Sequence, residues 1–152
     1  MTGWRLGYII APEKYVRSIQ ILQQNFFISP ANFVQHAGLA ALNDDHPEIE
    51  DMVSAYKKRR TVMIDSLRSI GFSINSNPGG AYYIFVNVKH LSQDSLKFTM
   101  ELLENAKVAV APGIDFGSNG EGYLRFSYAT SIEDIHEGVS RLKTYLSNRM
   151  GG

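Results

Sequence analysis

Cysteine is absent from this 152-residue chain. Its absence excludes a disulfide framework and any metal site built on thiolates. A chain without cysteine fits a reducing compartment only weakly, so the cytoplasm is taken as the default location. The length is enough for one substantial core and does not by itself require two domains.

An excess of charge of either sign is also missing, because 15 Lys and Arg residues balance 15 Asp and Glu residues. No basic field is available to attract nucleic acid or an anionic membrane, and neither is an expected partner. Long apolar runs are missing too, and the N-terminus lacks the basic, apolar and small-residue succession of a signal peptide. We expect a soluble protein.

The common patterns of metal sites and catalytic sets are likewise missing. The histidines are far apart and have no ligand-like spacing, which favours surface or capping roles. No Ser/His/Asp arrangement, glycine-rich nucleotide loop or pair of carboxylates on one face is present. No lysine of the chain is expected to be desolvated enough to act as a Schiff-base nucleophile. The chain itself therefore offers no complete catalytic set.

The N-terminal third predicts a short strand followed by two helices. The apolar run Leu6–Ala11 ends at Pro12, a residue that suits a first helical position. Apolar residues then recur at helical spacing up to Phe26 and predict a helix that packs one face on a neighbour. After a break at Ser29-Pro30, Phe33–Leu42 predicts a second helix, whose small residues allow close approach of another segment.

The longest helix is predicted from Pro47 to Ile70, with Gly71 as its left-handed C-terminal cap. A single apolar seam supports it, made by Ile49, Met52, Val53, Tyr56, Met63, Leu67 and Ile70. The seam lasts only about three heptads, which is too short to favour a coiled coil over an amphipathic helix of a globular domain.

The remaining sequence alternates short strands with helices. We expect strands at Phe72–Asn75 and Tyr82–Val88, separated by the turn residues Asn77–Gly80, as a hairpin or an adjacent pair. Further strands are expected at Val108–Ala111, ending in Pro112-Gly113, and at Tyr123–Tyr128. The pattern indicates an α/β (α+β) fold in which helices cover at least one face of a short sheet.

Two helices are expected among these strands. Ser92–Ala106 is predicted to turn Phe98, Leu102 and Leu103 inward. Ser131–Met150 is predicted as a capped helix, in which either Thr130 with Glu133 or Ser131 with Asp134 forms the capping box. Its inward side is made by Ile132, Ile135, Val139, Leu142 and Leu146.

Arg5 is the first candidate for binding chemistry. It lies between Trp4 and Leu6 at the start of an apolar segment, where an unpaired guanidinium is costly to desolvate and requires an anion. A phosphate would satisfy it. The alternative is a solvated arginine at the end of a strand.

Arg125 is the second candidate, as the only charged residue of the strand Tyr123–Tyr128. Strand alternation places Tyr123, Arg125 and Ser127 on one face and the apolar residues on the other. The planar guanidinium can make two parallel bonds to a carboxylate, so a carboxylate is the expected ligand. The alternative is an exposed arginine paired with Glu121 or Asp115.

Three motifs resemble segments of the class I and II aminotransferases, which bind pyridoxal 5'-phosphate (PLP) in a fold-type-I scaffold. Met1–Tyr8 closely resembles the segment that follows their cofactor lysine. Pro112–Gly117, followed by Leu-Arg-Phe at Arg125, resembles their Pro-Gly-x-x-Phe-Gly loop and carboxylate-binding motif. Gly79–Tyr83 resembles, less specifically, the Gly-Ala-Phe-Tyr loop that borders their substrate pocket.

The resemblance implies roles for three residues. Arg5 would bind the phosphate of PLP, and Arg125 the α-carboxylate of the amino-acid substrate. Tyr82 would border the substrate pocket, although an ordinary turn into a buried strand explains it equally well. No catalytic residue is assigned, because the Schiff-base lysine would fall before Met1.

The resemblance also implies a domain plan and an activity. Residues 1–45 would be a remnant of the large PLP-binding domain, with a strand and helices, and residues 46–152 the small domain. The chain would be the C-terminal part of a homodimeric enzyme that moves an amino group between an amino acid and a 2-oxo acid, and it would be inactive alone. Alternatives are another PLP-dependent reaction, by a lyase or synthase, and a non-catalytic ligand-sensing module.

Overall fold

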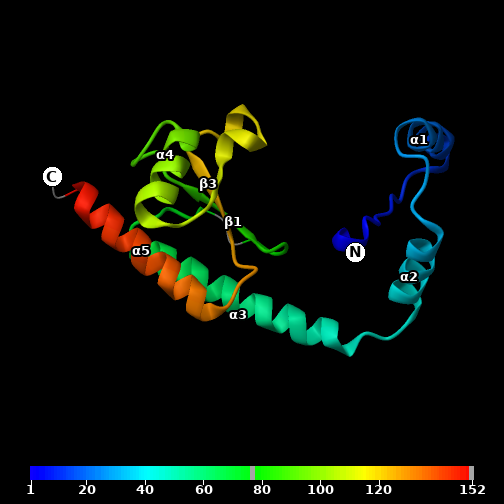
Figure 1. Ribbon diagram of the computed structural model, residues 1–152, viewed down its shortest axis with the longest axis horizontal. Coiled ribbons are helices and arrows are strands. Elements are labelled where there is room, and N and C mark those ends of the chain that lie inside the picture. Colours follow the sequence, from blue (N-terminus) through cyan, green and yellow to red (C-terminus); the bar gives the residue numbers. More distant parts are fainter. Residues whose placement is uncertain (76–77, 151–152) are drawn as a thin grey trace. The chain divides into compact units, whose positions relative to one another are not determined.

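The computed structural model describes residues 1–75 and 78–150. The chain divides into two compact units, Met1–Ile49 and Glu50–Gly152, called unit 1 and unit 2 below. Figure 1 identifies the helices and strands along the chain. Asn77 of the predicted turn lies outside the described residues.

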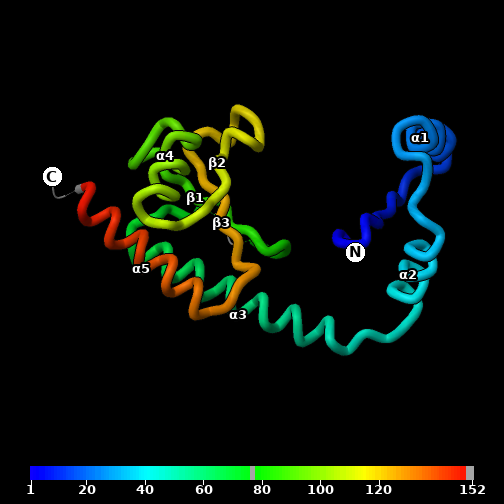
Figure 2. The backbone as a smooth tube through the Cα atoms, viewed as in Figure 1, coloured from blue at the N-terminus to red at the C-terminus, as the bar shows by residue number. Residues whose placement is uncertain are grey.

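Unit 1 contains helices but no strand. A short 3₁₀ turn at Thr2–Trp4 precedes α1, Glu13–Phe26, and α2, Asn32–Asn43, whose backbone course is traced in Figure 2. Both predicted helices are therefore confirmed. The predicted close approach to α2 is found at Gly38, where an added Cβ would overlap the side chain of Leu6.

The predicted strand Leu6–Ala11 is wrong for this structure, since these residues form no strand. A strand needs a hydrogen-bonded partner, and unit 1, all of which is described, holds only helices. The expected packing of α1 is not found either. None of its residues is buried, and its apolar stripe is largely exposed.

Unit 2 is a small antiparallel sheet covered by helices. The strands β1, Tyr83–Asn87, β2, Ala111–Pro112, and β3, Tyr123–Ser127, lie in the order β1-β3-β2. The helices are α3, Pro47–Ser69, α4, Ser95–Glu101, which continues into a π turn at Leu102–Ala106, and α5, Ile132–Met150. In Figure 1, α3 and α5 run side by side next to the strands.

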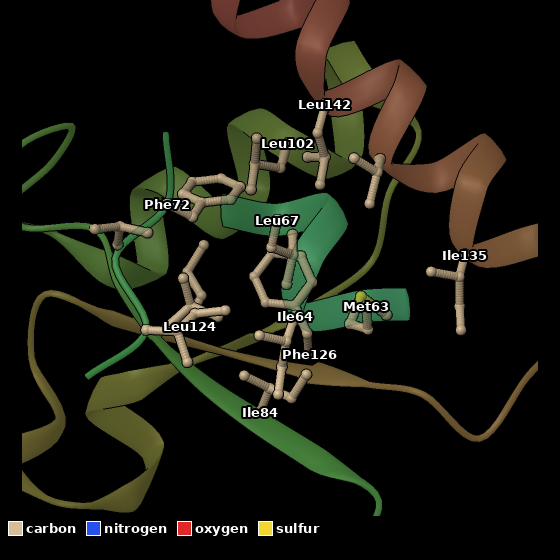
Figure 3. Close-up of a cluster of buried hydrophobic side chains, with 14 of the residues drawn as sticks. Met63, Ile64, Leu67, Phe72, Ile84, Leu102, Leu124, Phe126, Ile135 and Leu142 are labelled. Atoms are coloured by element: carbon tan, nitrogen blue, oxygen red, sulfur yellow. The ribbon is translucent and has the colours of Figure 1, made fainter. Parts of the chain in front are cut away.

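One hydrophobic core joins these helices to one face of the sheet (Figure 3). Alternate strand residues point into it, and the other alternate residues form an open face. The strands contribute Ile84, Val86, Leu124 and Phe126, and the helices contribute Met63, Ile64, Leu67, Phe98, Leu102, Ile135, Val139, Leu142 and Leu146.

The apolar seam predicted along α3 is only half right. Met63 and Leu67 are buried, whereas Ile49, Met52 and Val53 are exposed. Tyr56 and Ile70 pack partly buried against the core, and Ile64 joins it although the seam left it out. Gly71 has a φ of 93°, which confirms the predicted left-handed cap.

Three other expectations in unit 2 need correction. The strand expected at Val108–Ala111 is found only as β2, Ala111–Pro112, because these two residues alone pair with β3. Leu103 was expected inward but is exposed, because the helix widens into a π turn after α4 and changes the angular position of its residues. The strand expected at Phe72–Asn75 is reduced to a single antiparallel bridge between Ser73 and Asn87. The partner of β1 along its length is β3, which lies far from it in sequence.

The start of α5 decides between the two predicted capping boxes. The backbone N–H of Asp134 donates to Ser131 Oγ at 3.0 Å, so Ser131 with Asp134 is the pair that forms. Thr130 Oγ1 also donates to Asp134 Oδ2 at 2.8 Å. Hydrogen bonding of the Asp134 carboxylate with the side chain of Thr130, and next with that of Ser131, lowers the pKa of Asp134 below its ordinary value.

Candidate functional site

The open face of the sheet presents the guanidinium of Arg125. Residues Tyr123, Arg125 and Ser127 of β3 lie on this face, as the alternation predicted, while Leu124 and Phe126 are buried beneath. Arg125 is half-buried and lies opposite Phe85 of β1 in the strand register. Arg125 therefore lies in the middle of β3, the central strand of the short sheet.

Two aromatic rings flank the guanidinium. Its central carbon lies 4.1 Å from the ring centroid of Tyr83 and 4.7 Å from that of Phe116. Such contacts attract a cation to the faces of the rings and leave the N–H groups at its edge available for hydrogen bonds. Arg125 is held in this way without a carboxylate from the described part of the chain, where no ion pair involves it.

The alternative pairing of Arg125 with Glu121 or Asp115 is accordingly not found. Glu121 Oε1 instead accepts hydrogen bonds from the backbone N–H of Ser95 at 2.7 Å and of Gly122 at 2.8 Å. These bonds, the one from Gly122 above all, hold the pKa of the Glu121 carboxyl below its ordinary value of 4.5. Glu121 therefore anchors backbone and does not neutralise Arg125.

The loop that carries Phe116 is tightly anchored. Ser95, fully buried at the start of α4, accepts the backbone N–H of Ile114 at its Oγ, 3.2 Å away. Gly113 and Gly120 cross so closely that a Cβ on either would collide with the carbonyl oxygen of the other. Only glycine permits this approach, and the crossing fixes the loop that brings Phe116 to Arg125.

Tyr82 lies beside this arrangement. Its ring centroid is 4.2 Å from that of Tyr83, which in turn stacks on Arg125. Hydrogen bonding and charge interaction with Tyr83 raise the pKa of the Tyr82 phenol, while Arg125 acts in the opposite direction. Its backbone is set by Ala81, whose left-handed φ of 59° is held by a hydrogen bond from Tyr128 Oη to the Ala81 carbonyl.

Arg5 lies in unit 1, whereas Arg125 belongs to unit 2. It ends the first 3₁₀ turn with a φ of 55°, and its exposed side chain lines a hollow of about 990 Å³ together with Trp4, Tyr8 and Gln23. Within the described residues it forms no ion pair. Unit 1 thus offers a guanidinium at the wall of a hollow, free to meet an anion.

The structure thus brings two of the three predicted site residues, Arg125 and Tyr82, into one neighbourhood. Sequence reasoning assigned no role to Tyr83 and Phe116, whose rings contact the guanidinium, or to Phe85, the register partner of Arg125. The alternation of β1 would have placed Tyr83 and Phe85 on the face shared with Arg125. Phe116 was quoted only as part of a motif, and the fold of its loop was needed to bring it to Arg125.

The described residues contain neither a candidate membrane-spanning helix nor a candidate metal-binding cluster. No helix there is long and apolar enough to cross a membrane. No group of three or more His, Asp or Glu side chains is placed to hold a metal ion in that part of the chain.

The amino-acid sequence is similar to those of curated proteins. The chain is 41% identical over 148 residues to a (5-formylfuran-3-yl)methyl phosphate transaminase of Methanocaldococcus jannaschii, covering 97% of this chain and 39% of that protein. It is 38% identical over 148 residues to an aspartate aminotransferase of Pyrococcus horikoshii, covering 96% and 38%.

Solved structures give the same result. A crystal structure of an aromatic aminotransferase from Pyrococcus horikoshii superimposes with a TM-score of 0.90 at 37% identity, covering 99% of this chain and 40% of that one. The chain spans about 39% of the length of the Methanocaldococcus jannaschii relative. The family described as aminotransferase class I and II matches residues 1–142, and the chain belongs to that family.

Proposed function

We propose that this chain is part of a PLP-dependent aminotransferase that moves an amino group between an amino acid and a 2-oxo acid. The observation that carries the proposal is Arg125, a guanidinium in cation–π contact with two rings that forms no ion pair within the described residues. A substrate carboxylate is the ligand that this geometry suits. Family membership supports the same reaction.

Arg125 would act by orienting the substrate. Two parallel charge-assisted bonds fix the plane of a carboxylate as well as holding its charge. Tyr83 and Phe116 contact the guanidinium through their rings, which accept no N–H···O bond, so its N–H groups remain available to a carboxylate. Tyr82 would border the same pocket through its contact with Tyr83.

The residues of unit 1 fit the phosphate of PLP. Arg5 supplies a cationic fork without an acidic partner in the described chain, and its neighbours in the hollow include the aromatic side chains of Trp4 and Tyr8. When bound, PLP supplies the electron sink that allows the bond to the α-hydrogen to break. Arg5 would hold the phosphate, and no residue of this chain is assigned the role of Schiff-base lysine.

The proposal includes a domain plan and an assembly. Residues 1–45 would belong to the large PLP-binding domain and residues 46–152 to the small domain of a cytoplasmic homodimer. Exposed apolar side chains support a covered surface on unit 1, since Ile10 is 90% exposed and Phe27 is 74% exposed. We expect the isolated chain to self-associate and to be inactive, which sedimentation and an amino-transfer assay would test.

A chimera tests the proposed reaction. The chain would replace the matched segment of the Methanocaldococcus jannaschii transaminase, and the cofactor spectrum would be followed while a panel of amino acids is offered. Conversion of PLP to pyridoxamine phosphate is the expected result. Elimination products without pyridoxamine phosphate would indicate another PLP-dependent reaction, and ligand binding without any turnover would indicate a sensing module. Either result would overturn the proposed transamination.

A further inference from the structure

A row of aromatic side chains continues from Arg125 across the open face of the sheet. Phe116, which contacts the guanidinium, meets the ring of Phe85 edge-on at 5.7 Å between centroids. Phe85 in turn stacks on Tyr123 at 5.2 Å with an interplanar angle of 11°. The guanidinium therefore borders a continuous aromatic surface, formed by Phe116, Phe85 and Tyr123.

This aromatic surface is open to a ligand. Phe85 is 38% exposed and Phe116 is 50% exposed, although both are fully apolar. Removing apolar surface from water is favourable, so a ligand that covers these exposed rings gains binding free energy. A carboxylate bound at the edge of Arg125 would leave the rest of its molecule beside this surface, because Phe85 lies directly opposite Arg125 in the register.

The surface is also held in place before any ligand arrives. Phe85 is fixed by the pairing of β1 with β3, and Phe116 by the loop that Ser95 and the Gly113–Gly120 crossing anchor. A site that needs little ordering loses little free energy on binding. Aromatic rings add edge-to-face or stacked contacts that favour another ring over an aliphatic chain of similar size.

We propose that the carboxylate ligand of Arg125 carries an aromatic side chain, which Phe85 and Phe116 recognise. The inference rests on the proposed function, in which Arg125 binds a substrate carboxylate, and it adds the class of substrate. An acidic substrate would instead need a second cation. Lys89, whose Nζ lies 5.2 Å from the ring centroid of Tyr123 at the far end of the row, is a second cation, so an acidic ligand is the alternative that the experiment must distinguish.

The test is a binding titration of the full 152-residue chain, followed by ¹⁵N and aromatic ¹H NMR. The probes are 3-phenylpropionate, butyrate and succinate, which share a carboxylate and differ in an aryl group, a short alkyl chain or a second charge. We expect 3-phenylpropionate to bind about 3- to 10-fold more tightly than the other two, the range that one or two aromatic contacts provide. It should shift the ring signals of Phe85 and Phe116.

Three substitutions make the titration specific. Phe85→Ala and Phe116→Ala should each reduce the preference for the aryl probe, while Leu103→Ala, an exposed apolar residue of the π turn, should leave it unchanged. The amide signals of the core, compared across the variants, report whether each one folds. If Phe116→Ala disturbs its loop, Phe116→Leu keeps the volume and should still lower the preference.

Tighter binding of succinate, or a preference for the aryl probe that survives both alanine substitutions, would overturn the inference. Because binding is measured on the chain without amino transfer, this result is separate from that of the chimera. A chimera that fails to transaminate, beside intact binding of the aryl probe to Arg125, would overturn the proposed reaction and support the inferred recognition.

Discussion

The guanidinium carbon of Arg125 lies 4.1 Å from the centre of the Tyr83 ring, across the β1–β3 pair. Tyr83 is two residues from Phe85, the direct partner of Arg125, on the same face of β1, and reaches the guanidinium along the diagonal. A cation–π contact attracts the charge to the ring face and supplies no oxygen acceptor to the N–H groups. The ring of Tyr83 thus stabilises the positive charge of Arg125, as an acidic side chain would, but leaves the N–H groups of the guanidinium unpaired.

Arg125→Gln should abolish most carboxylate binding. A hydrogen bond to a charged group contributes about 1.5–3 kcal/mol, so affinity for 3-phenylpropionate should fall roughly 10- to 100-fold. Arg125→Lys keeps the charge but loses the fork, and an intermediate loss is expected. The NMR titration measures both.

As a control, Arg141→Gln removes an exposed arginine of α5 that pairs with Glu137, and it should not alter the affinity. Equal effects at both positions would contradict the assignment of Arg125.

Glu121 should make stability depend on pH in the acid range. Its pKa is lower in the folded chain than its ordinary value of 4.5, because the backbone N–H groups of Gly122 and Ser95 bind the ionised form. Its contribution is therefore complete above pH 4.5 and is lost as pH falls through the lowered pKa of the folded state. Thermal unfolding of unit 2 between pH 6 and pH 3 would record a falling Tm.

Glu121→Gln isolates that contribution. The amide oxygen can still accept both hydrogen bonds but carries no titrating charge, so the fall in Tm at acid pH should be smaller than in the parent chain. Asp134 should retain its own acid dependence, since its pKa is also lowered, and serves as an internal reference. Identical pH profiles for the parent chain and Glu121→Gln would rule out this role.

Local patterns in the sequence predicted much of the fold. Helix α3 and its cap at Gly71, and the two faces of β3, follow from periodicity and from a residue that tolerates positive φ. The strand predictions that were wrong concern pairing, which depends on distant parts of the chain. Leu6–Ala11 has the composition of a strand but no partner in unit 1, and the partner of β1 is β3 instead of the neighbouring segment near Ser73.

The candidate site shows the same division. Arg125 was identified because a lone charge in an apolar strand needs an explanation, and its own strand supplied the evidence. Phe116 and Phe85 come from other parts of the chain, and only the β1–β3 register and the crossing of Gly113 with Gly120 bring them to it. Such non-local contacts leave no periodic signal in the sequence.

Leu67→Ala should strongly destabilise unit 2. Leu67 is fully buried on α3 among residues of every helix of the core, so its truncation leaves a cavity that rigid neighbours cannot fill. A loss of about 2–5 kcal/mol is expected for such a change. Met52→Ala removes an exposed apolar residue of the same helix and should cost far less. Urea unfolding of both variants measures the difference, and similar midpoints would contradict the different burial of Leu67 and Met52.

Gly113→Ala should destabilise the loop that holds Phe116, because its new Cβ would overlap the carbonyl oxygen of Gly120, which belongs to backbone and cannot rotate away. Overpacking of this kind costs about 1–3 kcal/mol.

Gly138→Ala is the matched control, since an added Cβ there meets no atom within 4 Å and lies inside α5. It should stabilise the chain by about 0.5–1 kcal/mol, the difference in helix propensity. Urea unfolding measures whether the free energy of unfolding falls for Gly113→Ala and rises for Gly138→Ala. The NMR signals of the Phe116 ring show whether its loop is displaced. A Gly113→Ala variant with unchanged stability and unchanged Phe116 signals would show that the crossing does not position the aromatic surface.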